Sequence, residues 1–204
     1  LCDRRQRQMC IRDRDLSIEV TRRCNMACSH CMRGNAMALD ISHASIRNVL
    51  SRVRGVHSIN ITGGEPSLNV KAMRYLLSCL KRRGIPVDRF YIVTNGSLSS
   101  ISPDFIETCC ALYDYQTEKV EDTGRHMLEL SDDRFHNSTA REKVITCLSG
   151  LSFFRDAWPV RTHVPFQGRK MHSRFWQSGL SHLHGRGWSR SRRCLSQCKR
   201  YGLQ

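Results

Sequence analysis

Residues 15–150 alternate between short apolar runs and stretches of helical periodicity, and this alternation limits the folds open to the chain. The runs typical of strands are 16–21, 56–61, 90–94 and 127–131. Such alternation predicts an α/β fold in which helices cover a parallel sheet. In these folds, ligand-binding residues gather at the carboxyl ends of the strands.

Residues that commonly begin or end helices bound the helical stretches. Asp40 or Ser42 can cap one helix, for which Gly55 is the predicted stop. Apolar residues recur at helical spacing from residue 70 to residue 80, and Gly84 follows them. Ser102-Pro103 predicts a third helix start, because proline is favoured at the first helical position. A fourth helix is predicted over residues 138–148.

Three cysteines follow the first apolar run at the spacing C-x3-C-x2-C. Cys24, Cys28 and Cys31 place three thiols on one loop. Most [4Fe–4S] clusters have four Cys ligands, so a site with three leaves one iron open for chemistry. The alternative is structural zinc, which needs four ligands, and the fourth would have to come from a distant part of the chain. The spacing therefore favours an iron–sulfur cluster over zinc.

A second motif, Gly63-Gly64-Glu65-Pro66, follows the second apolar run directly. Two glycines at the end of a strand permit positive φ and a close approach of the backbone to a ligand. Glu65 adds an anion at the same edge of the sheet, where it can pair with an ammonium group. A Gly-Gly pair alone usually marks a turn. Here it follows a second predicted strand and comes after the cysteine motif, and this combination is more specific for a ligand site than the pair alone.

With these two motifs, the chain resembles the radical SAM superfamily over roughly residues 15–150. Weaker matches are Asn95, which follows the third apolar run, and Ser131, at the end of the fourth. The resemblance implies a partial (βα)6 barrel of the TIM type, of which about four βα units are readable in this chain.

The resemblance also implies the chemistry. Cys24, Cys28 and Cys31 would hold a [4Fe–4S] cluster whose open iron binds the amino and carboxylate groups of S-adenosylmethionine (SAM). The reduced cluster passes one electron to the sulfonium, and the S–C5′ bond breaks. The products are methionine and a 5′-deoxyadenosyl radical, which abstracts hydrogen from a substrate that the sequence does not identify. A flavodoxin or a ferredoxin would supply the electron.

The resemblance assigns roles to further residues at the strand ends. Gly63, Gly64 and Glu65 would receive the amino end of SAM. Asn95 and Ser131 would contact its ribose or carboxylate. His30 lies where the family often places a ring near the adenine.

Two other functions fit the same residues. One is an activating subunit that installs a radical on a partner protein, which requires an exposed docking face. The other is a non-catalytic zinc-binding module with a basic arm for nucleic acid, in which Cys194 and Cys198 would be additional metal ligands.

The net charge of +15 comes mainly from the two ends of the chain. Residues 1–14 carry five basic and two acidic side chains, and residues 151–204 carry eleven and one, which leaves +2 for residues 15–150. Nucleic acid is therefore not expected as a partner of the core. Eleven cysteines, without a signal peptide or a transmembrane run, predict a cytoplasmic protein that does not bind a membrane.

Both ends depart from the pattern of the core. Residues 9–14 can be encoded by a nucleotide sequence that resembles a transposon end, so residues 1–14 are expected to be a non-native leader. Residues 151–204 lack the strand–helix alternation, and codons for 187–204 read one base later can encode a strand-like peptide. We therefore expect a domain boundary at Gly150, followed by a basic tail that is out of frame or disordered.

Overall fold

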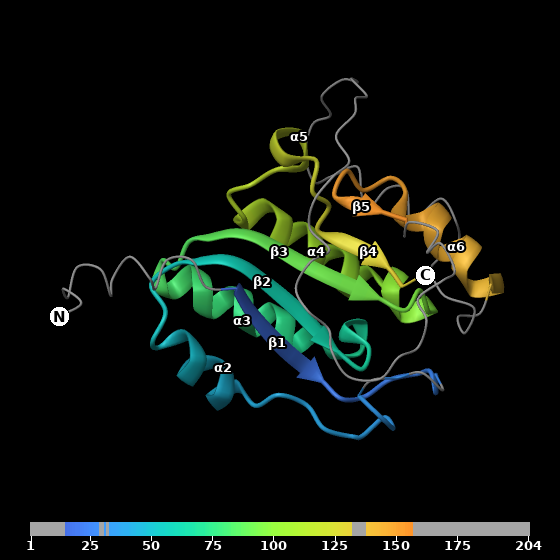
Figure 1. The fold of residues 1–204 in the computed structure, drawn as a ribbon, viewed down its shortest axis with the longest axis horizontal. Coiled ribbons are helices and arrows are strands. Elements are labelled where there is room, and N and C mark those ends of the chain that lie inside the picture. Colours follow the sequence, from blue (N-terminus) through green and yellow to red (C-terminus); the bar gives the residue numbers. More distant parts are fainter. Residues whose placement is uncertain (1–14, 29–30, 32, 132–137, 157–204) are drawn as a thin grey trace, which may run out of the picture.

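The computed structural model describes residues 15–28, 31, 33–131 and 138–156. Within them, one sheet contains the parallel strands in the order β1-β2-β3-β4-β5 (Figure 1). The strands are β1 Asp15–Thr21, β2 Val56–Gly63, β3 Val87–Thr94, β4 Leu128–Leu130 and β5 Phe154–Arg155. Neighbours in the sheet are neighbours in the sequence, as repeated βα units require. The predicted parallel α/β fold is confirmed, and its βα units are consistent with a partial TIM-type barrel.

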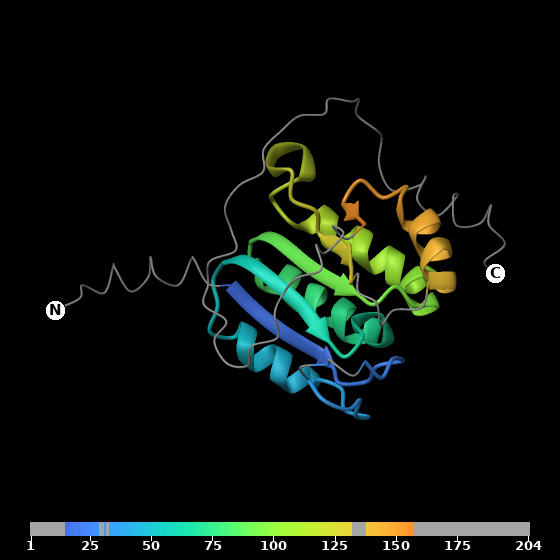
Figure 2. The same cartoon turned by 45° about the vertical axis from the view of Figure 1, so that its right-hand side comes forward.

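Helices and short helical turns connect the strands. The longer helices are α2 His43–Leu50, α3 Val70–Arg83, α4 Pro103–Tyr115 and α6 Ser138–Leu148. The shorter ones are α5 Val120–Thr123 and the 3-10 turns η1 Pro66–Asn69 and η2 Leu98–Ile101. Helices α3 and α4 pack against the same face of the sheet (Figures 1 and 2). In the part of the chain that the structure describes, no helix is long and apolar enough to span a bilayer.

Capping residues set the bounds of the helices much as predicted. The Oγ of Ser42 accepts a hydrogen bond from the Ser45 amide (3.0 Å), and that of Ser102 accepts one from the Phe105 amide (3.4 Å). Gly84 adopts a φ of +60° and ends α3, as a C-cap glycine does. The expected stop at Gly55 is wrong, because α2 already ends at Leu50.

The two faces of the sheet differ in polarity. The face covered by helices carries buried apolar side chains that alternate along the strands: Ile18, Val20, Ile59, Ile61, Phe90 and Ile92. The opposite face carries polar residues, including Glu19, which pairs with Thr62, and Glu129, which pairs with Val93 of β3. Glu129 accepts a hydrogen bond from the Tyr91 hydroxyl (2.9 Å) and one from Arg155 (3.0 Å). Polar side chains therefore line this face of the sheet as far as the carboxyl ends of the strands.

The fold continues past Gly150. Leu151, Phe153 and Phe154 are buried, and β5 pairs with β4 through Leu128↔Phe154 and Glu129↔Arg155. The sequence predicts no strand here, because two residues are too few to show a period of two. Residues 1–14 and 157–204, with Cys194 and Cys198, lie outside the described residues.

Candidate active site

The loop that carries the cysteines leaves β1 and returns to the same strand end. The Arg22 amide donates to the Leu39 carbonyl (2.7 Å), and the Met37 amide donates to the Arg22 carbonyl (3.0 Å). The Ile41 amide donates to the carbonyl of Val20 (3.1 Å). The sheet therefore holds both ends of the loop, although among the described strands only β2 flanks β1.

Asp40 reinforces the return of this loop. Its Oδ1 accepts hydrogen bonds from the Thr21 hydroxyl (2.5 Å) and from Arg23 Nε (3.0 Å). Desolvation alone would raise the pKa of Asp40, but the bonds from Thr21 and Arg23 and the Arg23 charge together lower it below 3.8. The carboxylate thus stabilises the loop at neutral pH, and this contribution is lost only as the pH falls through the lowered pKa.

The three cysteines are of the residue type that binds metal clusters through thiolates. Cys31 is exposed, and Cys24 and Cys28 are half-buried. The Cys31 amide donates to the Cys28 carbonyl (3.0 Å), which forms a turn between these two cysteines. The Cys24 Sγ accepts a hydrogen bond from the Met26 amide (3.4 Å), and such bonds stabilise thiolates and tune iron–sulfur clusters.

Gly63 and Gly64 bring the end of β2 into contact with the start of the cysteine loop. The Gly64 amide donates to the Thr21 carbonyl (2.8 Å), and the Glu65 amide donates to the Arg23 carbonyl (2.9 Å). A Cβ on Gly63 would lie 2.5 Å from the Thr21 oxygen, and one on Gly64 would lie 2.3 Å from the Arg23 oxygen. Neither glycine adopts the positive φ that this residue type permits. They are needed because another segment of backbone approaches them closely.

We predict that Gly64→Ala destabilises the protein by about 1–3 kcal/mol, because the new methyl group overlaps backbone that cannot move aside like a side chain. Gly34→Ala is the control: its Cβ would meet nothing within 4 Å, although its φ of +73° adds about 1 kcal/mol of strain. Urea unfolding of both variants measures the difference. Equal losses of stability would show that the close approach at Gly64 does not matter.

Glu65 is a buried carboxylate that joins three segments. It is 1% exposed. Its Oε1 accepts hydrogen bonds from the Thr94 hydroxyl (2.8 Å) and the Ser67 amide (3.1 Å), and its Oε2 accepts one from the Asn95 amide (2.8 Å). A buried charge requires such donors. Glu65 therefore fixes the end of β2, the start of η1 and the end of β3 relative to one another.

Asn95 extends this network to the cysteine loop. Its Nδ2 donates to Asn25 Oδ1 (2.8 Å) and lies 3.8 Å from the Cys24 Sγ. Asn25 Nδ2 in turn donates to the Ser97 Oγ (2.7 Å), and the Ser97 amide donates back to Asn95 Oδ1 (3.0 Å). The cysteine loop and the ends of β2 and β3 thus form one hydrogen-bonded unit.

The remaining predicted residues lie at or beyond the edge of this unit. The Ser131 amide donates to the Thr94 carbonyl (2.8 Å), which places Ser131 beside the end of β3. His30 lies outside the described residues, so its predicted position near the adenine is not tested.

Three further residues contribute to this region. Asn25 and Ser97 join the cysteine loop to the end of β3. Asn25 directly follows Cys24 and Ser97 comes two residues after Asn95, and this proximity in the sequence is the signal that points to them. Arg33 pairs with Glu19 (2.8 Å) and donates to the Thr62 hydroxyl (2.9 Å), which brings a guanidinium onto the polar face of the sheet. No motif in the sequence marks Arg33.

The thiols of the described residues should differ in reactivity. Cys109 is buried, and burial, with a smaller effect of the Glu65 charge, raises the pKa of its thiol far above the ordinary value. Burial also raises the pKa of Cys147. At pH 8 we expect iodoacetamide to modify Cys24, Cys28 and Cys31 at least tenfold faster than Cys109, as measured by peptide mass spectrometry of cluster-free protein. Uniform labelling would contradict the described packing.

The chain matches the sequence profile of the Radical SAM superfamily over residues 18–141, more than half of its length. It belongs to this superfamily. A GTP 3′,8-cyclase of Parasynechococcus marenigrum (strain WH8102) is 32% identical over 109 residues, which cover 49% of this chain and 30% of the relative. A GTP 3′,8-cyclase of Rhizobium etli (strain CIAT 652) is 30% identical over 100 residues, covering 46% and 29%. The match thus spans less than a third of each of these relatives.

The chain therefore carries a domain of the radical SAM superfamily, whose members use a [4Fe–4S] cluster and SAM. The zinc-binding alternative loses its support, because the cysteine motif lies within the matched region.

Proposed function

We propose that this chain cleaves SAM reductively and uses the resulting 5′-deoxyadenosyl radical to abstract hydrogen from a polar substrate. One observation carries the proposal: hydrogen bonds join the cysteine loop to the strand ends through Glu65 and Asn95. A cluster ligand and the residues proposed for SAM therefore belong to one rigid arrangement, as a reaction between two cofactors requires.

Cys24, Cys28 and Cys31 would hold the cluster, which supplies one electron to SAM when it is bound. The Met26 amide and the Asn95 side chain help to stabilise the sulfur of Cys24. The exposure of Cys31 leaves the loop accessible to a flavodoxin or a ferredoxin as electron donor.

The segment Gly63–Glu65 would receive the amino end of SAM. Its backbone is tied to Thr21 and Arg23, so its carbonyl groups have fixed positions. The Glu65 carboxylate already accepts three protein hydrogen bonds, and we therefore assign it mainly a positioning role. Asn95 and Ser131 would contact the ribose or carboxylate of SAM, and His30 its adenine.

The polar face of the sheet supports a polar substrate. Tyr91, Glu129 and Arg155 form a hydrogen-bonded row on the side away from the helices. GTP is the first substrate to test, because the curated relatives are named for a reaction of GTP. The alternative role as a radical-activating subunit would require a partner protein in place of a small substrate.

The test is formation of 5′-deoxyadenosine by anaerobically reconstituted protein, incubated with dithionite and SAM and measured by liquid chromatography. We expect slow formation that depends on reductant and is accelerated by the substrate. Protein that contains about four iron atoms per chain but forms no 5′-deoxyadenosine would overturn the proposal. If GTP does not increase the rate, GTP is excluded as the substrate while the cleavage of SAM stands.

A further inference from the structure

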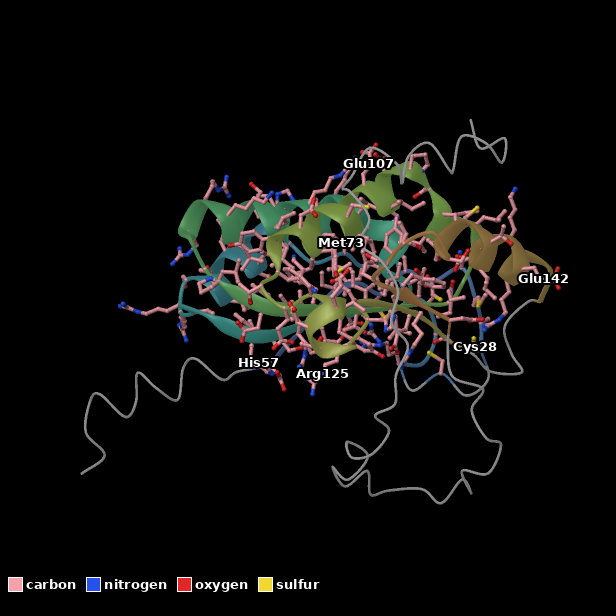
Figure 3. All side chains as sticks on the ribbon, turned by 90° about the horizontal axis from the view of Figure 1, so that it is seen from above. Cys28, His57, Met73, Glu107, Arg125 and Glu142 are labelled. Carbon is pink, nitrogen blue, oxygen red and sulfur yellow. The ribbon has the colours of Figure 1, made fainter. Side chains whose placement is uncertain are left out.

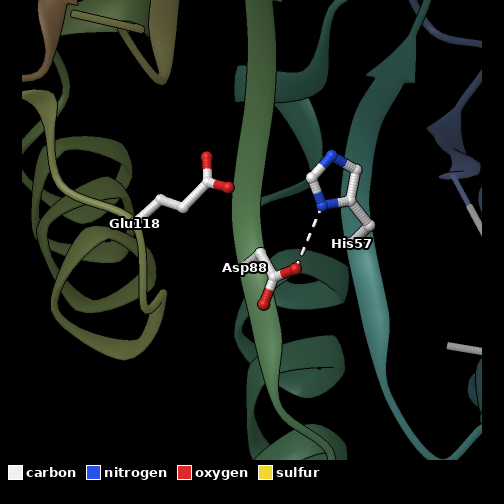
Figure 4. Close-up of side chains that lie close together, drawn as sticks. All are labelled: His57, Asp88 and Glu118. Carbon is white, nitrogen blue, oxygen red and sulfur yellow. Dashed lines mark hydrogen bonds and ion pairs between the residues drawn. The ribbon is translucent and has the colours of Figure 1, made fainter. Parts of the chain in front are cut away.

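A cluster of one imidazole and two carboxylates lies at the end of the sheet opposite the cysteines. His57 is the second residue of β2, Asp88 is the second residue of β3, and Glu118 lies in the connection between α4 and α5. One donor atom from each lies within 4.8 Å of the other two. His57 Nδ1 and Asp88 Oδ2 are 3.0 Å apart, and the Glu118 carboxylate extends toward this pair (Figure 4).

We propose that His57, Asp88 and Glu118 bind one divalent ion of the first transition row, such as Mn²⁺ or Zn²⁺. An imidazole nitrogen and two carboxylates form a donor set that such ions accept. At metal–ligand distances of about 2.0–2.2 Å, two ligand atoms of one ion lie roughly 3–4.4 Å apart. The described separations therefore need only small side-chain rotations to reach that range.

The surroundings of Glu118 give independent support for an ion. Its Oε2 is buried and accepts no hydrogen bond from the described residues. It forms an ion pair with Arg89 Nη1 at 3.8 Å, which is long for a charge-assisted hydrogen bond. Arg89 Nη1 is likewise buried without a hydrogen-bond acceptor among the described residues, so the two charges face each other without a close contact. A cation between Glu118 and Asp88 would compensate the carboxylate at shorter range.

The scaffold holds the three ligands in place before any ion binds. The Glu118 amide donates to the Asp88 carbonyl (2.8 Å), and the Thr117 amide donates to the Val87 carbonyl (3.0 Å). The Thr117 hydroxyl donates to Asp88 Oδ1 (3.2 Å), which orients this carboxylate and leaves Oδ2 facing His57. Partners of this kind commonly orient the ligands of metal sites.

The site is separate from the cysteine loop. His57 lies near the start of β2 and Gly63 at its end, so the two ends of this strand are roughly 20 Å apart at about 3.3 Å per residue. His57 and Cys28 also lie far apart in Figure 3. An ion bound by His57, Asp88 and Glu118 would join β2, β3 and the segment after α4. We infer a stabilising role for it, as expected for the amino-terminal ends of barrel strands.

The test is a titration of the full chain with MnCl2, after cluster reconstitution and removal of excess iron, with free Mn²⁺ measured by electron paramagnetic resonance. Mn²⁺ is the probe because it prefers oxygen and nitrogen to thiolate, so the cysteines compete little. We expect one ion per chain, and at least tenfold weaker binding in Asp88→Asn and Glu118→Gln. Asp122→Asn on α5 is the matched control and should bind like the unmodified protein.

A fourth variant distinguishes a metal site from a loss of folding. Arg89→Gln removes the cation that competes for Glu118 and should tighten Mn²⁺ binding several-fold. It should also increase the rise in melting temperature that MnCl2 produces, because an ion that binds only the folded state stabilises it. Absence of stoichiometric binding, or equal affinity in Asp88→Asn and the unmodified protein, would overturn the proposal.

Discussion

Replacing Cys28 with alanine is expected to reduce the iron content of reconstituted protein from about four atoms per chain to below one. Two thiolates from this loop do not retain a cluster that three would hold. The Cys28 carbonyl still accepts the hydrogen bond from the Cys31 amide in the variant, so the turn of the loop is preserved. Iron and sulfide analysis, together with the brown colour of the cluster, measures the effect.

Cys110→Ala is the matched control for this experiment. Cys110 is half-buried like Cys28, but it lies on α4 away from the cysteine loop. The control should retain the full iron and sulfide content. If Cys28→Ala and Cys110→Ala contain equal amounts of iron, Cys28 is not a ligand and the proposed cluster site is wrong.

Glu65→Ala is expected to lower the free energy of unfolding by about 3–5 kcal/mol. The variant leaves the Ser67 amide, the Thr94 hydroxyl and the Asn95 amide without their acceptor, and each unsatisfied buried donor costs about 1–3 kcal/mol. For a chain of this size, the loss corresponds to roughly 10 °C in melting temperature. Urea unfolding and calorimetry measure it.

Two further variants show how Glu65 acts. Glu142→Ala removes an exposed carboxylate from α6 and should change stability by less than about 0.5 kcal/mol. Glu65→Gln keeps the size of the side chain but removes its charge. If this charge pairs directly with the ammonium of SAM, affinity for SAM should fall about ten- to a hundredfold in a stable variant. If Glu65 only positions the backbone, the affinity of Glu65→Gln for SAM should fall only in proportion to the fraction of the variant that is unfolded.

Local signals allowed much of the fold to be predicted. Ser102 and Gly84 bound helices because capping depends on the residue itself and its immediate neighbours. The buried alternation of Ile59, Ile61 and Phe90 follows from the period of a strand. These features need no knowledge of distant contacts.

Contacts between distant residues limited the prediction of the site. The residue type of Glu65 indicates an anion, but only the register of β2 and β3 brings Thr94 and Asn95 to it. The sequence predicts that a ligand approaches Gly64 closely. In the structure, the closest approach is instead made by the backbone of Arg23. Residues 154–155 form a strand only because β4 lies beside them.

The agreement between strand order and chain order also shapes how the protein can fold during synthesis. Every hydrogen bond described among the cysteine loop, Glu65 and Asn95 joins residues that precede Leu98. A growing chain can therefore pair β1, β2 and β3 in turn, without waiting for a distant segment to close the sheet. The cysteine loop would then reach its native conformation on the ribosome before α6 and β5 have been synthesised.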